Sequence, residues 1–144
     1  MGYGELEKII KEYEGKYSNI HFQPAVKPEQ VILYTRSADV GLAVFKNACL
    51  SYYYSLPNKL FEYILSGIPL IVSDFPEMAK FVDDKLCGWK VIPEDGALYD
   101  LIANITLDDA QIKKMNVRKI MNNYEWGFEG NTLLSLYKKL INVE

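Results

Sequence analysis

The sequence is poor in the residues that build metal centres and disulfide frameworks. Its 144 residues include two cysteines, Cys49 and Cys87, and one histidine, His21. The cysteines are far apart and lack the spacing of metal ligands, so we expect no zinc site, no disulfide scaffold and a reducing compartment. We predict no metal and no cofactor, and we interpret His21 as a structural side chain rather than a catalytic base.

Long hydrophobic runs and an excess of positive charge are also missing. No segment approaches the ~20 consecutive apolar residues of a membrane span, and the first fifteen residues, MGYGELEKIIKEYEG, are too charged for a secretory signal. The formal net charge of -3 gives no general attraction to polyanions, so nucleic acid is not expected as a partner. We expect a cytoplasmic protein with a small ligand, and peripheral attachment to the inner membrane face stays open.

The chain instead alternates helical and strand patterns. Periodic apolar residues and capping signals predict helices over residues 5–17, 28–37, 57–66, 76–83 and 98–105. Apolar runs predict strands over residues 20–23, 39–45, 68–73 and 89–92, the second of them covered on both faces. The rest is predicted helical, with one apolar face at Ile112, Met115, Ile120, Met121 and Tyr124 and another at Leu133, Leu136, Tyr137, Leu140 and Ile141.

This alternation predicts an α/β fold, a Rossmann-like parallel sheet flanked by helices. Right-handed crossovers place the loops that follow the strands at the carboxyl edge of such a sheet, where ligands bind. These loops are residues 23–27, 46–55, 74–75 and 93–96. We therefore expect the site to be built from them.

The stretch SLPNKLFEYILSGIPLIVSD, residues 55–74, carries the clearest chemistry. A helix that starts with Pro57 as its first residue directs unpaired N–H groups and the positive end of its dipole above the carboxyl edge, which favours an anion. Asn58 can donate from its amide and Lys59 adds a positive charge in the same turn. A phosphate would stabilise this arrangement. The alternative, that Lys59 simply extends into water, has equal weight from this feature alone.

Other residues near this stretch have a functional and a structural interpretation. Glu62 lies one turn after Asn58 and can accept hydrogen bonds from ribose hydroxyls, or it is a solvated helix residue. Of the tyrosines at 52–54, at least one is expected in the core, and an outward ring can stack on a base or sugar. For two further features we favour a structural interpretation. We expect the basic residues of one helix to form a solvated face, namely Lys113, Lys114, Arg118 and Lys119. We expect Gly88 to end a helix.

The run SLPNKLFEYILSGIPLIVSDFPEM, with DVGLAVF before it and CGWKVIPED after it, resembles the C-terminal, donor-binding domain of GT-B-fold glycosyltransferases, in particular glycosyltransferase family 4, or group 1. The resemblance extends from GYGELEKII to YEWGFEGNTLLSLYKKL. It implies a nucleotide-diphosphate sugar as substrate and a hexosyltransferase that builds cell-surface polysaccharide or glycoconjugate.

The resemblance also implies particular site residues. That family has two glutamates separated by seven residues, the first contacting the donor sugar and the second the ribose. Glu62 matches the second, whereas the first falls on Tyr54, so the pair is broken. The implied substrate-binding residues are Ser55, Leu56, Asn58, Lys59, Leu60 and Glu62. Tyr54, Asp74 and Glu77 are implied as contacts from the donor loops.

Domains of this kind open with two strands before the position of GYG, and a separate N-terminal domain supplies the acceptor site. We therefore expect residues 1–144 to be part of a larger two-domain enzyme, inactive in isolation, with an incomplete sheet whose unpaired strand edges can self-associate. Two alternatives stay open. One is a non-enzymatic doubly wound module that binds a partner protein, and the other is a sugar-nucleotide epimerase with the same fold.

Overall fold

The computed structural model describes residues 1–141, apart from the side chains of residues 126, 128 and 129, and divides the chain into two compact units. The first unit is Met1–Val31 and the second is Ile32–Glu144. Helix α2 (Pro28–Thr35) begins in the first unit and ends in the second, close to the predicted range. Within residues 1–141, none of the helices has the length and apolar content that a membrane crossing requires.

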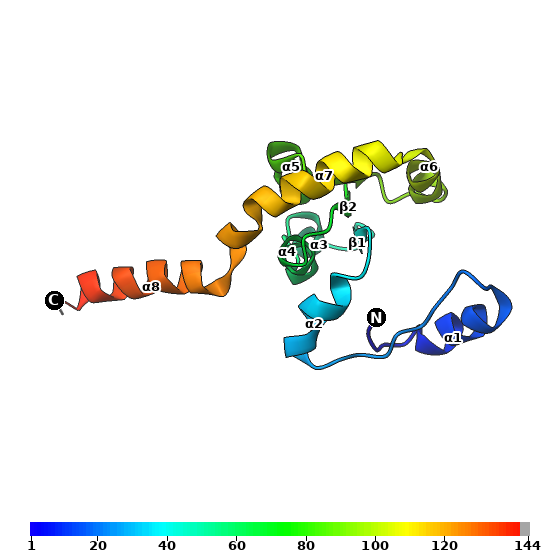
Figure 1. Ribbon diagram of the computed structural model, residues 1–144, viewed down its shortest axis with the longest axis horizontal. Helices are drawn as coiled ribbons and strands as arrows, with labels where there is room; N and C mark the ends of the chain where they lie inside the picture. The colour runs from blue at the N-terminus through cyan, green and yellow to red at the C-terminus, as the bar shows by residue number, and fades with distance from the viewer. Residues whose placement is uncertain (142–144) are drawn as a thin grey trace. The chain divides into compact units, whose positions relative to one another are not determined.

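The first unit consists mainly of helix α1 (Glu7–Lys16) and an extended segment that follows it (Figure 1). The helix is confirmed, and Glu7 pairs with Lys11 at 2.7 Å as an i,i+4 ion pair. The predicted strand over residues 20–23 is wrong. The only pairing described there is one isolated parallel bridge between Gly2 and Pro24, because an extended segment becomes a strand only when a neighbour bonds several of its backbone groups.

The apolar face of α1 has no cover within its own unit. Its five members are exposed to between 39% and 64%, namely Leu6, Ile9, Ile10, Tyr13 and Tyr17. The spacing of these residues therefore identified the helix correctly, but the burial that amphipathic spacing usually indicates is not found in this unit.

The second unit is built on a three-stranded parallel sheet in the order β1-β2-β3. The strands are β1 (Gly41–Ala43), β2 (Leu70–Ser73) and β3 (Gly88–Val91). Its helices are α3 (Leu50–Tyr53), α4 (Asn58–Leu65), α5 (Pro76–Lys85), α6 (Ala97–Asn104), α7 (Leu107–Ile120), the 3-10 helix η1 (Met121–Tyr124) and α8 (Trp126–Leu140). The predicted α/β class is confirmed, with helices flanking a parallel sheet.

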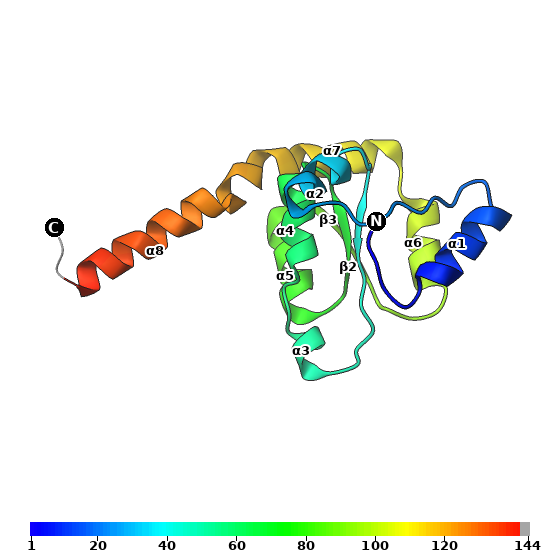
Figure 2. The same cartoon turned by 90° about the horizontal axis from the view of Figure 1, so that it is seen from below.

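The crossover helices define the two ends of this sheet. Helices α4 and α5 connect consecutive strands and lie on the same face, as right-handed crossovers require (Figure 2). Helix α7 lies across the end of the sheet opposite α3. The Nδ2 group of Asn116 on α7 donates to the carbonyl of Leu86, just after α5, at 3.1 Å. Helix α7 therefore meets the C-terminal end of α5 and lies away from the carboxyl edge of the strands.

The core lies between the sheet and helices α4, α5 and α7. All four residues of β2 are buried, because this central strand is paired on both sides. The core cluster contains Ala43, Leu60, Ile64, Leu70, Val72, Phe75, Met78, Val82, Cys87 and Val117. The apolar face of residues 55–74 thus anchors α4, mainly through Leu60 and Ile64. This anchoring fixes the position of the N-terminus of α4.

Strand β1 is shorter than predicted and is not covered on both faces. Leu42, in its middle, is 46% exposed, while Gly41 and Ala43 on either side are buried. The Gly41 N–H bonds to the carbonyl of Pro69, so the backbone groups of Gly41 point towards β2. Because alternate residues of a parallel strand bond to the same neighbour, the backbone groups of Leu42 point away from β2. The hydroxyl of Tyr63 donates to the Leu42 carbonyl at 3.0 Å and satisfies that acceptor at the sheet edge.

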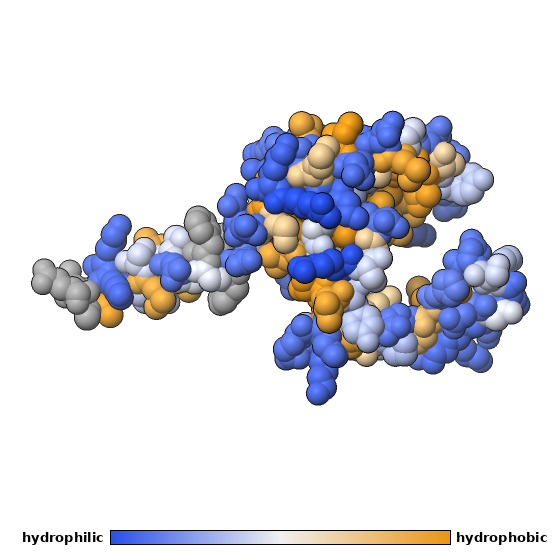
Figure 3. All heavy atoms as spheres, viewed as in Figure 1, coloured by the Kyte–Doolittle hydropathy of each residue, from blue (hydrophilic) through white to orange (hydrophobic). Residues whose placement is uncertain are grey.

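The C-terminal apolar faces also differ from the prediction. Ile112 and Met115 are 53% and 49% exposed, and the buried residue of α7 is Val117. Ile120, Met121 and Tyr124 pack against the core as expected. On α8, the five predicted members Leu133, Leu136, Tyr137, Leu140 and Ile141 are all exposed, and hydrophobic side chains are visible along this helix in Figure 3.

The side chain of Lys113 lies against the protein, whereas the apolar pattern predicted this for its neighbours Ile112 and Met115. Its side chain is only 18% exposed and its Nζ lies 5.2 Å from the centre of the Trp89 ring. The indole of Trp89 donates to Asp109 at 2.6 Å, and Asp109 lies 3.7 Å from the same ammonium. Lys113 is therefore not part of a solvated basic face, because its long apolar stem covers an aromatic ring while its charge meets a carboxylate.

Two glycines have different roles. Gly67, just after α4, has a φ of +73° and ends that helix. Gly88 does not end a helix, since the left-handed residue after α5 is Leu86 with a φ of 51°. Gly88 is the first residue of β3, and a Cβ atom there would collide with the backbone carbonyl of Leu70. Its lack of a side chain allows the close approach of β3 to β2.

Candidate functional site

The carboxyl edge of the sheet brings together three of the four loops predicted to form a site. Residues 46–55, 74–75 and 93–96 follow β1, β2 and β3, which are parallel. The first of these is not wholly a loop, because residues 50–53 form helix α3. The fourth predicted loop, residues 23–27, belongs entirely to the first unit, which is described by itself. The site below therefore concerns the second unit alone.

The N-terminus of α4 is open. Pro57 is the N-cap, with φ and ψ of -74° and 149°, so the prediction that it is the first helical residue is wrong by one position. Asn58 and Lys59 begin the helix and are exposed, and no side chain caps this end. The N–H of Leu60 is already bonded to the Pro57 carbonyl at 3.0 Å. The free backbone donors of this turn are therefore expected to be those of Asn58 and Lys59.

The remaining predicted residues of this turn have distinct environments. The Ser55 hydroxyl donates to the carbonyl of Tyr52 at 3.0 Å, which closes the turn between α3 and α4. Leu56 is 39% exposed, whereas the Leu60 side chain is fully buried. Leu60 thus anchors the helix and can offer a ligand only backbone atoms. Asn58 and Lys59 are the predicted residues whose side chains extend into solvent at this end.

Glu62 lies one turn farther along α4 and is half-buried. Its backbone carbonyl accepts from Ser66, so its contribution to the helix is ordinary. Burial raises the pKa of the neighbouring Tyr63 phenol, and the negative charge of the Glu62 carboxylate raises it further. The carboxylate therefore lies on the same helix as the open N-terminus, displaced from it by one helical turn.

Aromatic contacts connect the loop after β1 with the start of α5. The ring of Tyr53 packs on Phe75 with centroids 5.1 Å apart, and Phe75 is 3% exposed. Tyr54 is 59% exposed and meets Tyr53 edge-on, with centroids at 4.9 Å and planes at 84°. Tyr53 is the inward tyrosine that the sequence led us to expect, and Tyr54 faces solvent.

Asp74 and Glu77 lie at the start of α5 on this same edge. Both are exposed. The Asp74 N–H donates to the Val91 carbonyl at 2.8 Å, which extends the pairing of β2 with β3 by one residue. Phe75, between them, is the N-cap of α5 and has no side-chain cap. The edge thus carries two exposed carboxylates beside the aromatic contacts of the loop after β1.

Sequence reasoning missed the contacts that hold this edge in place. The hydroxyl of Ser73 at the end of β2 bonds to both backbone groups of Phe45 in the loop after β1. Tyr53 contacts Phe75, which lies twenty-two positions later in the chain. Ser73, at the end of an apolar strand, and Phe75, an isolated phenylalanine after it, were weak signals in the sequence. Neither residue type indicates which residue its side chain contacts.

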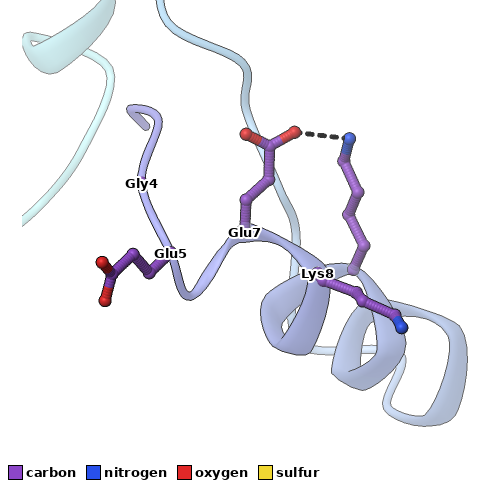
Figure 4. Close-up of a pocket in the computed structure, with 5 residues that line it drawn as sticks. Gly4, Glu5, Glu7 and Lys8 are labelled. Atoms are coloured by element: carbon purple, nitrogen blue, oxygen red, sulfur yellow. Dashed lines mark hydrogen bonds and ion pairs between the residues drawn. The ribbon is translucent and has the colours of Figure 1, made fainter.

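The remaining predicted features lie elsewhere. His21 is exposed in the first unit. Within that unit, Gly4, Glu5, Glu7, Lys8 and Lys11 line a wide hollow of about 390 Å³. Figure 4 shows the pair of Glu7 with Lys11, with Glu5 and Lys8 pointing away from it. Over residues 1–141, no cluster of three or more His, Cys, Asp or Glu side chains has the arrangement of a metal site.

The fold and this edge describe a Rossmann-like domain of the kind that binds ligands beyond the ends of its strands. Residues 4–135 match the family model described as the glucosyltransferase 3-like, C-terminal domain. The chain belongs to this family, because the match covers most of its length. A comparison with curated proteins found no match. The protein is thus a glycosyltransferase C-terminal domain, which corresponds to the coarser part of the predicted resemblance.

Proposed function

We propose that this domain binds the nucleotide-diphosphate sugar donor of a GT-B-fold glycosyltransferase of the family 4, or group 1, type. The observation that carries the proposal is the uncapped N-terminus of α4 at the carboxyl edge, with Asn58 and Lys59 exposed beside it. The match to a glucosyltransferase-like family supports glycosyl transfer and favours a glucosyl donor. No metal and no cofactor is part of the proposal.

In this proposal the start of α4 holds the diphosphate. The N–H groups of Asn58 and Lys59 donate to its oxygens, and the Lys59 ammonium adds a full positive charge to that of the helix dipole. Ser55 and Leu56 shape the turn before the helix, and Leu60 fixes the helix in the core. Negative charge that grows on the departing nucleoside diphosphate during sugar transfer would be stabilised by these donors.

Residues around this start would contact the rest of the donor. Glu62, one turn along α4, accepts hydrogen bonds from the ribose hydroxyls. Tyr54, Asp74 and Glu77 contact the donor from the loops after β1 and β2. The proposal is consistent with their positions, since the contact of Tyr53 with Phe75 connects those two loops.

The wider activity belongs to a larger protein in this proposal. A separate N-terminal domain would supply the acceptor site, so residues 1–144 would bind the donor but not transfer the sugar. The full-length enzyme would transfer a hexose in the synthesis of cell-surface polysaccharide or glycoconjugate, at the cytoplasmic side and peripherally at the inner membrane face. Self-association through the outer edge of β1, where Leu42 is exposed, is proposed as a further contact.

Binding of nucleotides to the 144-residue chain tests the proposal. UDP, GDP and ADP are titrated while backbone amide chemical shifts are followed. We expect one of them to shift the amides of Asn58 and Lys59 and neighbouring residues. Lys59→Gln should weaken that binding about tenfold or more, because it removes a charge-assisted hydrogen bond of ~1.5–3 kcal/mol. Lys80→Gln, an exposed lysine on α5, is the matched control and should leave affinity unchanged.

The outcomes separate this function from its alternatives. An intact fold without shifts near Asn58 for any nucleotide would contradict donor binding and favour a protein-interaction module. The uncovered apolar face of α8 would then be a surface for its partner. Nucleotide binding with epimerisation, but no transfer, by the full-length protein would instead identify a sugar-nucleotide epimerase.

A further inference from the structure

We propose that the ring of Tyr54 is a stacking platform for the sugar ring of the donor, and that it distinguishes a nucleotide sugar from the bare nucleotide. This inference rests on the proposed function, since it takes the diphosphate to lie at the start of α4. The Tyr54 ring would contact the apolar ring face of the sugar rather than its hydroxyl groups.

The first support is that the ring is both exposed and held. Tyr54 is 59% exposed, which leaves much of its surface available to a ligand. Its ring meets Tyr53 edge-on at 4.9 Å, and Tyr53 in turn packs on Phe75 at 5.1 Å. Phe75 is 3% exposed and belongs to the core cluster. A short series of aromatic contacts therefore connects the exposed ring to the core, so little freedom remains to be lost on binding.

The second support is the order of groups along the chain. Tyr54 precedes the open N–H groups of Asn58 and Lys59, and Glu62 follows them by one helical turn. A diphosphate links the nucleoside on one side to the sugar on the other. If Glu62 bonds the ribose, the nucleoside extends along α4, and the sugar leaves in the opposite direction, towards the turn that carries Tyr54.

The third support is the chemistry of the side chain. Tyr54 has no charge to bind a second phosphate, and its aromatic face matches the C–H face of a pyranose ring. Aromatic contacts contribute about 0.5–1.5 kcal/mol beyond burial, which corresponds to roughly three- to tenfold in affinity. The neighbouring exposed ring, Tyr52, is turned to a different contact, with its centroid 6.2 Å from that of Phe45. Tyr54 and Tyr52 therefore form a matched pair for an experiment.

The test compares a nucleotide with its glucosyl form on the 144-residue chain. UDP and UDP-glucose, and the GDP and ADP pairs, are titrated against the unsubstituted chain, Tyr54→Ala, Tyr54→Phe and Tyr52→Ala. We expect Tyr54→Ala to weaken the nucleotide sugar about three- to tenfold and to leave the nucleotide within twofold. Tyr54→Phe should keep the affinity for both, since the ring is retained, and Tyr52→Ala should leave both unchanged.

Several results would overturn the inference. Equal weakening of nucleotide and nucleotide sugar by Tyr54→Ala would show that the ring contacts the nucleoside or only supports the turn. No weakening of either would show that the ring takes no part in binding. In both cases the unsubstituted chain would still bind the nucleotide, and Lys59→Gln would still weaken that binding. If neither nucleotide nor nucleotide sugar bound the unsubstituted chain, the proposed function and this inference would fall together.

Discussion

The Ser73 hydroxyl at the end of β2 bonds to both backbone groups of Phe45, which lies in the loop after β1. It accepts from the Phe45 N–H at 2.7 Å and donates to the Phe45 carbonyl at 2.9 Å. Ser73 is fully buried. Through these two bonds its side chain continues the pairing of β1 with β2 beyond the last residue of β1. The loop that carries the tyrosines is thus attached to the central strand of the sheet.

Replacing Ser73 with alanine should destabilise the second unit by about 1–3 kcal/mol, because two backbone groups of Phe45 lose the hydroxyl that bonds them. The free energy of unfolding, from urea titration followed by circular dichroism, measures this change. Ser51→Ala, at an exposed position of α3, is the control and should stay within about 0.5 kcal/mol. Equal effects of the two substitutions would show that the hydroxyl of Ser73 does not hold the loop.

Substitution of Gly88 should disturb the pairing of β3 with β2. A Cβ atom at this position meets the Leu70 carbonyl, and backbone cannot move aside as the end of a side chain can. We expect Gly88→Ala to lower the free energy of unfolding by about 1–3 kcal/mol, measured by the same urea titration. Gly127→Ala, where a Cβ atom meets open space within α8, should instead be neutral or stabilising by up to about 1 kcal/mol. Unchanged stability in Gly88→Ala would contradict the close approach of the two strands.

Stability should fall in alkaline solution, partly through Tyr63. Burial raises the pKa of its hydroxyl above the ordinary 10.0, and the nearby Glu62 carboxylate raises it further. The unfolded chain therefore loses this proton first as the pH rises past about 10. The stabilisation is fully present below that pH and is lost as the pH rises through the higher pKa of the folded state.

Tyr63→Phe isolates this contribution. The variant should be less stable by about 1 kcal/mol at pH 7, because the bond to Leu42 is lost, and its stability should fall less steeply above pH 10. Urea midpoints across this range, with phenolate absorbance, provide the measurement. Burial also raises the pKa of Cys87, from 9.0 to about 11, so Tyr63→Phe removes only part of the decline. Identical slopes in the two proteins would exclude the phenol as a source.

A substitution at Glu62 separates recognition of the nucleoside from recognition of the phosphates. Glu62→Gln should weaken the preferred nucleoside diphosphate by about tenfold, since hydrogen bonds to a charged group contribute ~1.5–3 kcal/mol, and should leave inorganic pyrophosphate unaffected. Calorimetric titration of both ligands measures the difference. Glu77→Gln, an exposed carboxylate in the first turn of α5, serves as a comparison. If pyrophosphate weakened as much as the nucleotide, Glu62 would not be the ribose acceptor.

The elements with strong apolar patterns could be predicted from sequence, and those that depend on neighbours could not. β2 and α4 were located because a fully buried strand and a helix with Leu60 and Ile64 on one side both have distinctive spacing. The segment at 20–23 has the composition of a strand but only an isolated bridge beside it. A strand is completed by backbone groups from elsewhere in the chain, and a local pattern does not show whether those groups are present.

The candidate site shows the same division. The open turn at Asn58 and Lys59 follows from local capping chemistry, and the structure has no side chain closing it. Which of three consecutive tyrosines faces inward was left open, and it is Tyr53 that packs on Phe75. Lys113 was misjudged for a related reason, since residue type marks it as solvated while its stem covers Trp89.

The order of residues alone determined that strands would alternate with helices in the part of the chain after residue 39, and that the apolar helix at residues 58–65 would begin with a polar turn that carries a lysine. Both depend on hydrogen bonds and side-chain spacing within a few positions of the chain. Only the tertiary structure decided which faces are covered, that Ser73 holds Phe45, and that Tyr54 stands exposed on a buried aromatic support. The bonds of Ser73 to Phe45 and the contact of Tyr53 with Phe75 join residues more than twenty positions apart, and these partners are selected by packing and strand register rather than by local preference.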